Sequence, residues 1–177
     1  SEVGEIRISA DENQIVSVQL TGVDTSMILQ NAATHDNTGN RRRKIRELLF
    51  QEIRIDDEGT LFPTRTVNWR ATERHVVVAF DNVREMGDEA FTPPDEGQWK
   101  VVLDFPFDDD GHGPGDDRRR AEEWLGANPD GCRTLVWIPS FLSAEGQRDL
   151  GRMVVLDHIL ERDRLDQYAS HLSADDR

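Results

Sequence analysis

An aspartate ends an apolar run in the middle of the chain. Residues 101–103 read Val-Val-Leu, Asp104 follows them, and Asp108 lies four residues further on, beyond Pro106. The carboxyl end of a buried parallel strand is where α/β proteins bind ligands, and a carboxylate there can hold magnesium beside a nucleotide. The phosphate-binding pattern Gly-x-x-x-x-Gly-Lys-Ser/Thr is absent from the sequence. The position at a strand end makes Asp104 and Asp108 candidate catalytic residues. Because the phosphate-binding pattern is missing, we favour the alternative, a turn that ends the strand.

The segment after this strand is rich in residues that could bind a metal ion. Hard oxygen ligands of this kind suit magnesium or calcium. The spacing does not match a calcium-binding loop, so we favour an exposed acidic loop and predict no metal site. The residues concerned are Asp108, Asp109, Asp110, His112, Asp116 and Asp117.

A basic cluster precedes the middle of the chain, formed by Arg41, Arg42, Arg43, Lys44 and Arg46. If Asn40 caps the helix that follows, these charges oppose the helix dipole and cost a few tenths to about 1 kcal/mol each. Phosphate or nucleic acid is one partner that could offset this cost, because helix N-termini attract anions. Pairing with the protein's own carboxylates is the alternative, and we favour it.

Residues 24–80 also fit a winged-helix pattern. Two helices are followed by a hairpin, so the basic helix would read DNA and residues 71–74 would form the wing. The net charge of −14 disfavours this, because a uniformly acidic surface repels nucleic acid and anionic membranes. Direct DNA binding would therefore require a local basic patch.

Other features point to a cytoplasmic protein with its own core. No apolar run approaches the roughly 18 residues that a membrane helix needs. The single cysteine, Cys132, excludes an internal disulfide framework and favours a reducing compartment. The four tryptophans lie in expected strands or on apolar helix faces, so we predict that they belong to the core. They are Trp69, Trp99, Trp124 and Trp137.

The spacing of apolar residues predicts a mixed α/β fold. The N-terminal part reads as strands at 5–10 and 14–20, a helix at 25–33 capped by Asp24, a helix after Asn40, and a hairpin of strands at 64–70 and 75–80. After the boundary at 86–98 we expect a strand at 99–105, a helix at 117–125, a strand at 134–138 and a helix at 147–161, with a last helix beyond 165. This β-α-β-α order predicts two pieces, 1–92 and 93–177, which could share one core. Ser173 and the acids after it resemble a helix start, which indicates a fragment excised from the interior of a larger protein.

Several phrases of the sequence together resemble a known family. They are Gly-Asn-Arg-Arg-Arg at 39–43, Thr-Val-Asn-Trp-Arg at 66–70, Ala-Phe-Asp-Asn-Val-Arg-Glu at 79–85, Val-Leu-Asp-Phe-Pro-Phe-Asp at 102–108, Thr-Leu-Val-Trp-Ile-Pro-Ser-Phe-Leu at 134–142 and Asp-Leu-Gly-Arg-Met-Val-Val-Leu-Asp-His at 149–158. In this order, over residues 20–177, they resemble an interior segment of the large PglY-type ATPases of the bacterial phage growth limitation and BREX defence systems.

The resemblance implies a role in blocking phage propagation, with partners that include a methyltransferase and the other domains of the parent protein. It implies ATP and magnesium for the complete protein, bound elsewhere in it, and none for this segment. Three hypotheses follow: a non-catalytic module that couples nucleotide state to a partner or DNA, a winged-helix module that binds DNA through residues 41–46, and a metal-dependent phosphoryl-transfer site at Asp104 and Asp108.

Overall fold

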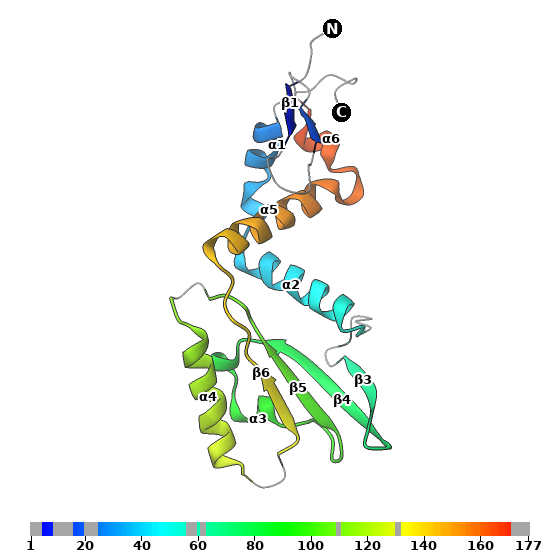
Figure 1. Cartoon of the computed structure of the whole chain (residues 1–177), viewed down its shortest axis with the longest axis vertical. Helices are drawn as coiled ribbons and strands as arrows, with labels where there is room; N and C mark the ends of the chain where they lie inside the picture. The colour runs from blue at the N-terminus through cyan, green and yellow to red at the C-terminus, as the bar shows by residue number, and fades with distance from the viewer. Residues whose placement is uncertain are drawn as a thin grey trace. The chain divides into compact units, whose positions relative to one another are not determined.

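The chain forms two compact units in a computed structural model. One unit comprises residues 1–36 and 152–177, and the other comprises residues 37–151. The structure describes residues 5–8, 16–19, 25–55, 60, 63–108, 111–129 and 132–170. Figure 1 shows the elements in chain order.

The first unit is mainly helical. It contains the antiparallel pair β1 (Glu5–Ile8) and β2 (Val16–Gln19), α1 (Thr25–Asn31), η1 (Ala33–His35), η3 (Glu161–Asp163) and α6 (Leu165–Tyr168). The helix α5 (Ala144–Leu160) contributes its last residues, from Arg152 onward. The core consists of Ile28, Ala32, Val155, Ile159 and Ala169. The hairpin is therefore confirmed, while the predicted caps at Asp24 and Ser173 lie outside the described residues.

The second unit is built on a four-stranded sheet with the order β3-β4-β5-β6. The strands are β3 (Thr64–Trp69), β4 (Thr72–Asp81), β5 (Trp99–Asp104) and β6 (Thr134–Trp137). β3 and β4 are antiparallel, whereas β4 and β5, and β5 and β6, are parallel. Arg70 and Ala71 make the tight turn between β3 and β4 with φ of 51° and 58°, as a two-residue hairpin loop requires.

Helices cover both faces of this sheet. On the α2 face, Phe50 and Ile55, at and just beyond the end of α2 (Thr38–Glu52), pack on Val78 and Leu103. On the α4 face, Trp124 of α4 (Pro114–Ala127) packs with Val102. The segments η2 (Val83–Glu85) and α3 (Asp88–Phe91), between β4 and β5, complete this second layer with Val83 and Phe91. The period-two alternation of the strands thus gives each face its own core.

The predicted mixed α/β class is confirmed, and the β-α-β-α order forms as β5-α4-β6-α5. The sequence-based boundary at residue 92 does not coincide with the observed division, because β4 and β5 lie on either side of it and pair in one sheet. The winged-helix arrangement does not form. α1 packs in the first unit, whereas α2 packs on a sheet in which β4 has a parallel neighbour.

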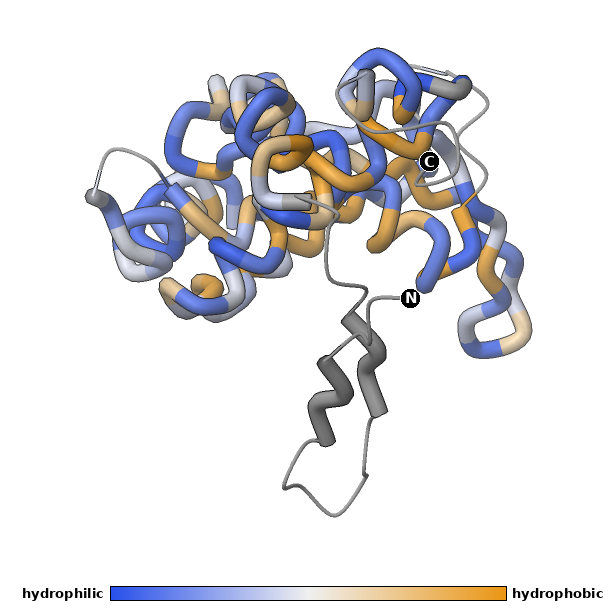
Figure 2. Tube along the Cα trace, turned by 90° about the horizontal axis from the view of Figure 1, so that it is seen from above, coloured by the Kyte–Doolittle hydropathy of each residue, from blue (hydrophilic) through white to orange (hydrophobic). Residues whose placement is uncertain are grey.

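Hydrophobic and hydrophilic stretches alternate along the described trace (Figure 2). This matches the alternation expected of strands and amphipathic helices. None of the described helices combines the length and the apolar character needed to cross a membrane.

The α4-face core supplies a stability prediction. Phe91 is fully buried, and its ring stacks on that of Trp124 with centroids 5.0 Å apart. We expect Phe91→Ala to lower the free energy of unfolding by about 3–5 kcal/mol, because it leaves a cavity in a closed layer. Urea denaturation followed by tryptophan fluorescence measures it, since all four tryptophans belong to the second unit. Leu125→Ala, at a half-exposed position of α4, is the control with a small expected effect; equal losses would contradict the assigned core.

Candidate functional site

The parallel pairing of β4 and β5 brings two aspartates to one edge of the sheet. Asp81 ends β4, Asp104 ends β5, and the two residues are direct partners in the register. Asp81 is exposed and accepts a hydrogen bond from the Asn82 N–H at 2.8 Å. Asp104 is only 2% exposed. The edge therefore carries one solvated carboxylate and one buried carboxylate.

Asp104 is bound on one side only. Its Oδ1 accepts a hydrogen bond from the Val83 N–H at 3.0 Å, while its Oδ2 is buried without a hydrogen-bond partner. Burial raises the pKa of Asp104 to about 6; the Val83 hydrogen bond opposes this shift, and the negative Asp117 nearby adds to it. A buried acid with a free oxygen and a raised pKa is a feature of functional sites, although structural networks also produce it.

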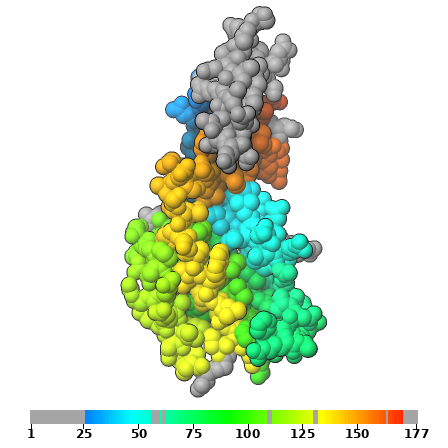
Figure 3. All heavy atoms as spheres, viewed as in Figure 1, coloured from blue at the N-terminus to red at the C-terminus, as the bar shows by residue number. Residues whose placement is uncertain are grey.

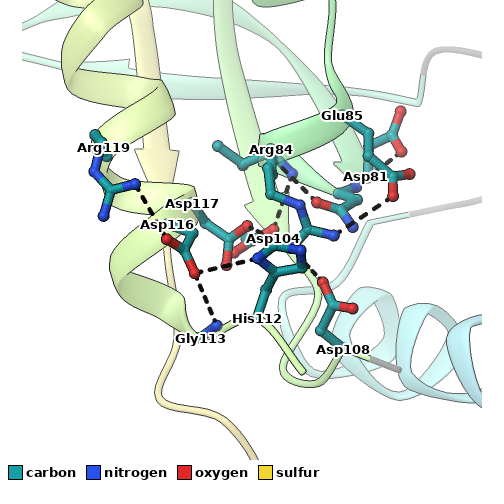
Figure 4. A network of polar contacts seen from close by, with 12 residues as sticks. Asp81, Arg84, Glu85, Asp104, Asp108, His112, Gly113, Asp116, Asp117 and Arg119 are labelled. Atoms are coloured by element: carbon teal, nitrogen blue, oxygen red, sulfur yellow. Dashed lines mark hydrogen bonds and ion pairs between the residues drawn. The ribbon is translucent and has the colours of Figure 1, made fainter. Parts of the chain in front are cut away.

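Arg84 lies at the centre of this acidic group (Figure 4). One Nη of its guanidinium lies 2.5 Å from Asp108 Oδ2 and 3.9 Å from Asp117 Oδ1. The Asp108 hydrogen bond is the main cause that raises the pKa of Arg84. Arg84 thereby joins three segments: the turn after β4, the loop after β5, and the first turn of α4. We call Arg84, Asp104, Asp108 and Asp117 the acidic network.

Two members of this network were predicted to lie in an exposed loop, and that prediction is wrong for them. The side chain of Asp108 is 4% exposed and that of Asp117 is 2% exposed. Burial raises the pKa of Asp117, and the positive charge of Arg84 opposes the shift. The long separation between Arg84 and Asp108 in the sequence hides their pairing, so no local pattern pointed to Arg84.

The first turn of α4 holds the remaining described part of the acidic segment. Asp116 accepts a hydrogen bond from the Gly113 N–H at 3.2 Å, and this bond lowers the pKa of Asp116. His112 and Arg119 lie 3.4 Å and 3.2 Å from its carboxylate. This carboxylate therefore caps the helix start, as acids do at N-termini. Asp109 and Asp110 lie outside the described residues.

The described members of this acidic segment are not gathered into a metal site. Among the described residues, no three His, Cys, Asp or Glu side chains are arranged to hold a metal ion. Nor does the chain contain a phosphate-binding loop that would fit ATP and its magnesium. The residues present thus do not fit the nucleotide that the family resemblance implies for the complete protein.

The predicted basic cluster lies on the opposite side of the sheet from Asp104. The side chain of Asp104 follows Lys100 and Val102 on the α4 face, whereas α2 covers the other face. Arg42 packs over the ring of Phe105 at 4.4 Å and Arg46 over the ring of Phe50 at 4.7 Å. The basic cluster and Asp104 therefore do not lie together in a position to bind one phosphate.

The start of α2 also differs from the prediction. Asn37, and not Asn40, is the N-cap: its side chain accepts a hydrogen bond from the Asn40 N–H at 3.0 Å. The helix then begins at Thr38, so only Arg41 lies within the first turn and the expected dipole cost largely disappears. Lys44 pairs with Glu47 at 3.2 Å, in the way favoured from the sequence, while Arg43 is exposed.

A second polar cluster lies in the first unit, at residues for which the sequence predicted no site. The rings of His35 and His158 stack with centroids 3.3 Å apart. The hydroxyl of Tyr168 lies 3.0 Å from His158 Nε2 and 3.2 Å from His35 Nε2, and Arg164 lies 2.8 Å from His158 Nδ1. These residues come from three separate segments, so only the tertiary fold reveals the group.

A comparison with protein families identifies the chain. A family model described as the PglY fourth domain matches residues 28–177. The chain belongs to the PglY family. It is therefore part of a PglY-like phage-defence protein, as the resemblance of its sequence phrases predicted. No solved structure is significantly similar to it.

The raised pKa of Asp104 predicts how this PglY domain responds to pH. Because the folded domain binds the Asp104 proton more tightly than the unfolded chain does, ionisation of this group costs stability as pH rises from about 4 to 6. Asp104→Asn removes that ionisation and keeps an acceptor for the Val83 N–H. We expect the variant to be more stable than the parent by about 3 kcal/mol at pH 8 and equally stable near pH 4.

Urea denaturation across this pH range measures the difference. Asp81→Asn, at the equivalent exposed position on β4, should leave the pH profile of the parent in place. A destabilised Asp104→Asn variant at pH 8 would show that the ionised carboxylate is held by a favourable partner.

Proposed function

We propose that this PglY domain is a non-catalytic coupling module of the phage-defence protein. The observation that carries the proposal is the position of Arg84. At the carboxyl edge of the parallel strands, where α/β proteins bind ligands, the protein's own guanidinium lies between Asp108 and Asp117. An edge bridged by its own side chain is suited to transmit movement between segments.

The charges of the acidic network give the module a physical means of switching. Three buried or nearly buried carboxylates, those of Asp104, Asp108 and Asp117, surround one guanidinium. When all three are ionised, two negative charges remain unbalanced, and such charges are costly in a buried place. Protonation of one acid, or a cation brought by another domain, would shift Arg84 and with it the ends of β4, β5 and α4.

The partners of the module are proposed from the family resemblance. Other domains of the parent protein would bind and hydrolyse ATP with magnesium, as the family resemblance implies; this chain has no phosphate-binding loop. A methyltransferase of the same defence system would be a further partner. The domain would relay the nucleotide state of the parent protein to such a partner.

The test separates coupling from catalysis in the complete PglY protein. We expect Asp104→Asn to weaken protection against phage by about tenfold in plaque assays, because coupling energies between sites are commonly of this size. Nucleotide hydrolysis by the purified protein should stay unchanged, and Asp81→Asn should change neither readout. Loss of hydrolysis with Asp104→Asn, or ATP hydrolysis by the isolated 177-residue chain, would refute a non-catalytic role.

A metal-dependent phosphoryl-transfer site at Asp104 and Asp108 is the second candidate. The unpartnered Oδ2 of Asp104 favours it, whereas the engagement of Asp108 by Arg84 opposes it. Calorimetric titration of the chain with magnesium and manganese distinguishes the two functions. Binding that Asp104→Asn abolishes would support the metal site; no heat at millimolar metal supports the coupling module.

A further inference from the structure

Three of the four tryptophans share one face of the sheet. Side chains of directly paired residues point to the same face, and Val78 and Leu103 define the α2 face. Trp69 pairs with Thr72, six residues before Val78 on the same strand; Trp99 pairs with Val76; and Trp137 pairs with Leu103. All three tryptophans therefore lie on the α2 face.

This part of the face is not closed by packing. Trp69 on β3 is 61% exposed, Trp137 on β6 is 47% exposed, and Leu135, beside Trp137 on β6, is 59% exposed. Trp99 is half-buried. In the space-filling view, the yellow segment that includes β6 lies at the surface (Figure 3). The prediction that Trp69 and Trp137 belong to the core is thus wrong, and large aromatic side chains are enriched at interaction surfaces.

Arginines accompany these tryptophans. Arg65 and Arg74 lie on the α2 face by the same register, and the guanidinium of Arg70 lies over the ring of Trp69 at 5.8 Å. Arg65 donates a hydrogen bond to the backbone oxygen of Ile53, and the Nε of Arg74 is buried without a partner. Within the described part of the chain, none of these three arginines forms an ion pair with an acid. Their positive charges remain available.

The acidic residues of the same strands are sorted to the other face. Strands β3 to β6 contain three acids, Glu73, Asp81 and Asp104, and all three alternate onto the α4 face. Glu73 is further engaged by His75 at 3.7 Å on that face. In a chain of net charge −14, the strands thus present a face with arginines and no acid. Local positive charge of this kind is what polyanion binding requires.

The aromatic positions follow a diagonal across the sheet. From Trp69 on β3 the line passes Arg74 on β4 and Trp99 on β5 to Trp137 on β6. The strand spacing and the rise per residue place its ends roughly 30 Å apart. Flat rings spaced along a sheet, with cations beside them, form the type of surface on which unpaired bases of one strand stack.

We propose that the α2 face of the sheet binds single-stranded nucleic acid. Bases stack on Trp69, Trp99 and Trp137, while the phosphates contact the arginines at positions 65, 70 and 74. A duplex fits less well, because its bases are already stacked on each other. An apolar protein partner would leave the arginines unpaired, so the charge on this face favours a polyanion. The inference does not depend on the coupling role of the acidic network.

The test uses fluorescence anisotropy with labelled oligonucleotides of about 15 nucleotides at about 50 mM salt, titrated with the 177-residue chain. We expect single-stranded DNA or RNA to bind, the preferred strand identifying the ligand, and a matched duplex to bind at least about tenfold more weakly. Three phosphate contacts on a single strand predict that log K falls with log salt at a slope of about −2.

Substitutions locate the surface. Trp69→Ala and Trp137→Ala should each weaken binding by about tenfold, because stacking on one ring contributes about that much, and Trp69→Phe should retain most of it. Arg70→Ala should reduce the salt slope by about 0.7. Both tryptophans are exposed, so circular dichroism should show intact folds. Arg118→Ala, an exposed arginine on α4, makes the same change in charge and should have no effect.

Three results would overturn the proposal. They are no binding of either single strand, duplex binding as tight as single-strand binding, and equal losses from Arg70→Ala and Arg118→Ala. The last would show that only overall charge matters.

Discussion

The alternation of side chains along β5 separates the chemistry of this domain into two faces. Val102 and Asp104 point toward α4, whereas Val101 and Leu103 point toward α2. This separation follows from the pleat of the strand, because successive side chains point to opposite faces of the sheet. A shift of one residue in the register of β5 would place Val102 and Asp104 on the α2 face, and Val101 and Leu103 on the α4 face. The acidic network and the arginine-tryptophan face are thus kept apart by the sheet itself.

The buried carboxylates are more readily explained by function than by stability. A guanidinium between two acids rarely adds net stability, because desolvation of the charges offsets much of their attraction. The free Oδ2 of Asp104 adds a cost that an apolar side chain would avoid. A PglY domain that keeps such a group retains a site whose energy changes with protonation or with a nearby cation, which is the property that a coupling element needs.

Sequence reasoning was strongest where the signal is local. The β3–β4 hairpin, strands β5 and β6, and helices α4 and α5 all form near their predicted positions, because alternation, turn residues and helical spacing act over a few residues. α4 starts at Pro114, earlier than predicted, because Pro114 and the cap at Asp116 extend its first turn. The observed start of α2 also differs from the predicted one. Both Asn37 and Asn40 are suitable N-cap residues, and only the structure shows that the Asn37 side chain accepts the hydrogen bond.

The sequence by itself determined the family, the mixed α/β class and the position of Asp104 at the end of a strand. Only the tertiary structure decided that Asp108 is buried against Arg84 and that the basic helix α2 packs on the face of the sheet opposite to Asp104. It also decided that Trp69 and Trp137 are exposed. These outcomes depend on which strands become neighbours and how far one helix reaches across a sheet. An amphipathic pattern indicates which side chains are suited to a core. Whether those side chains are buried depends on packing segments that are distant in the sequence.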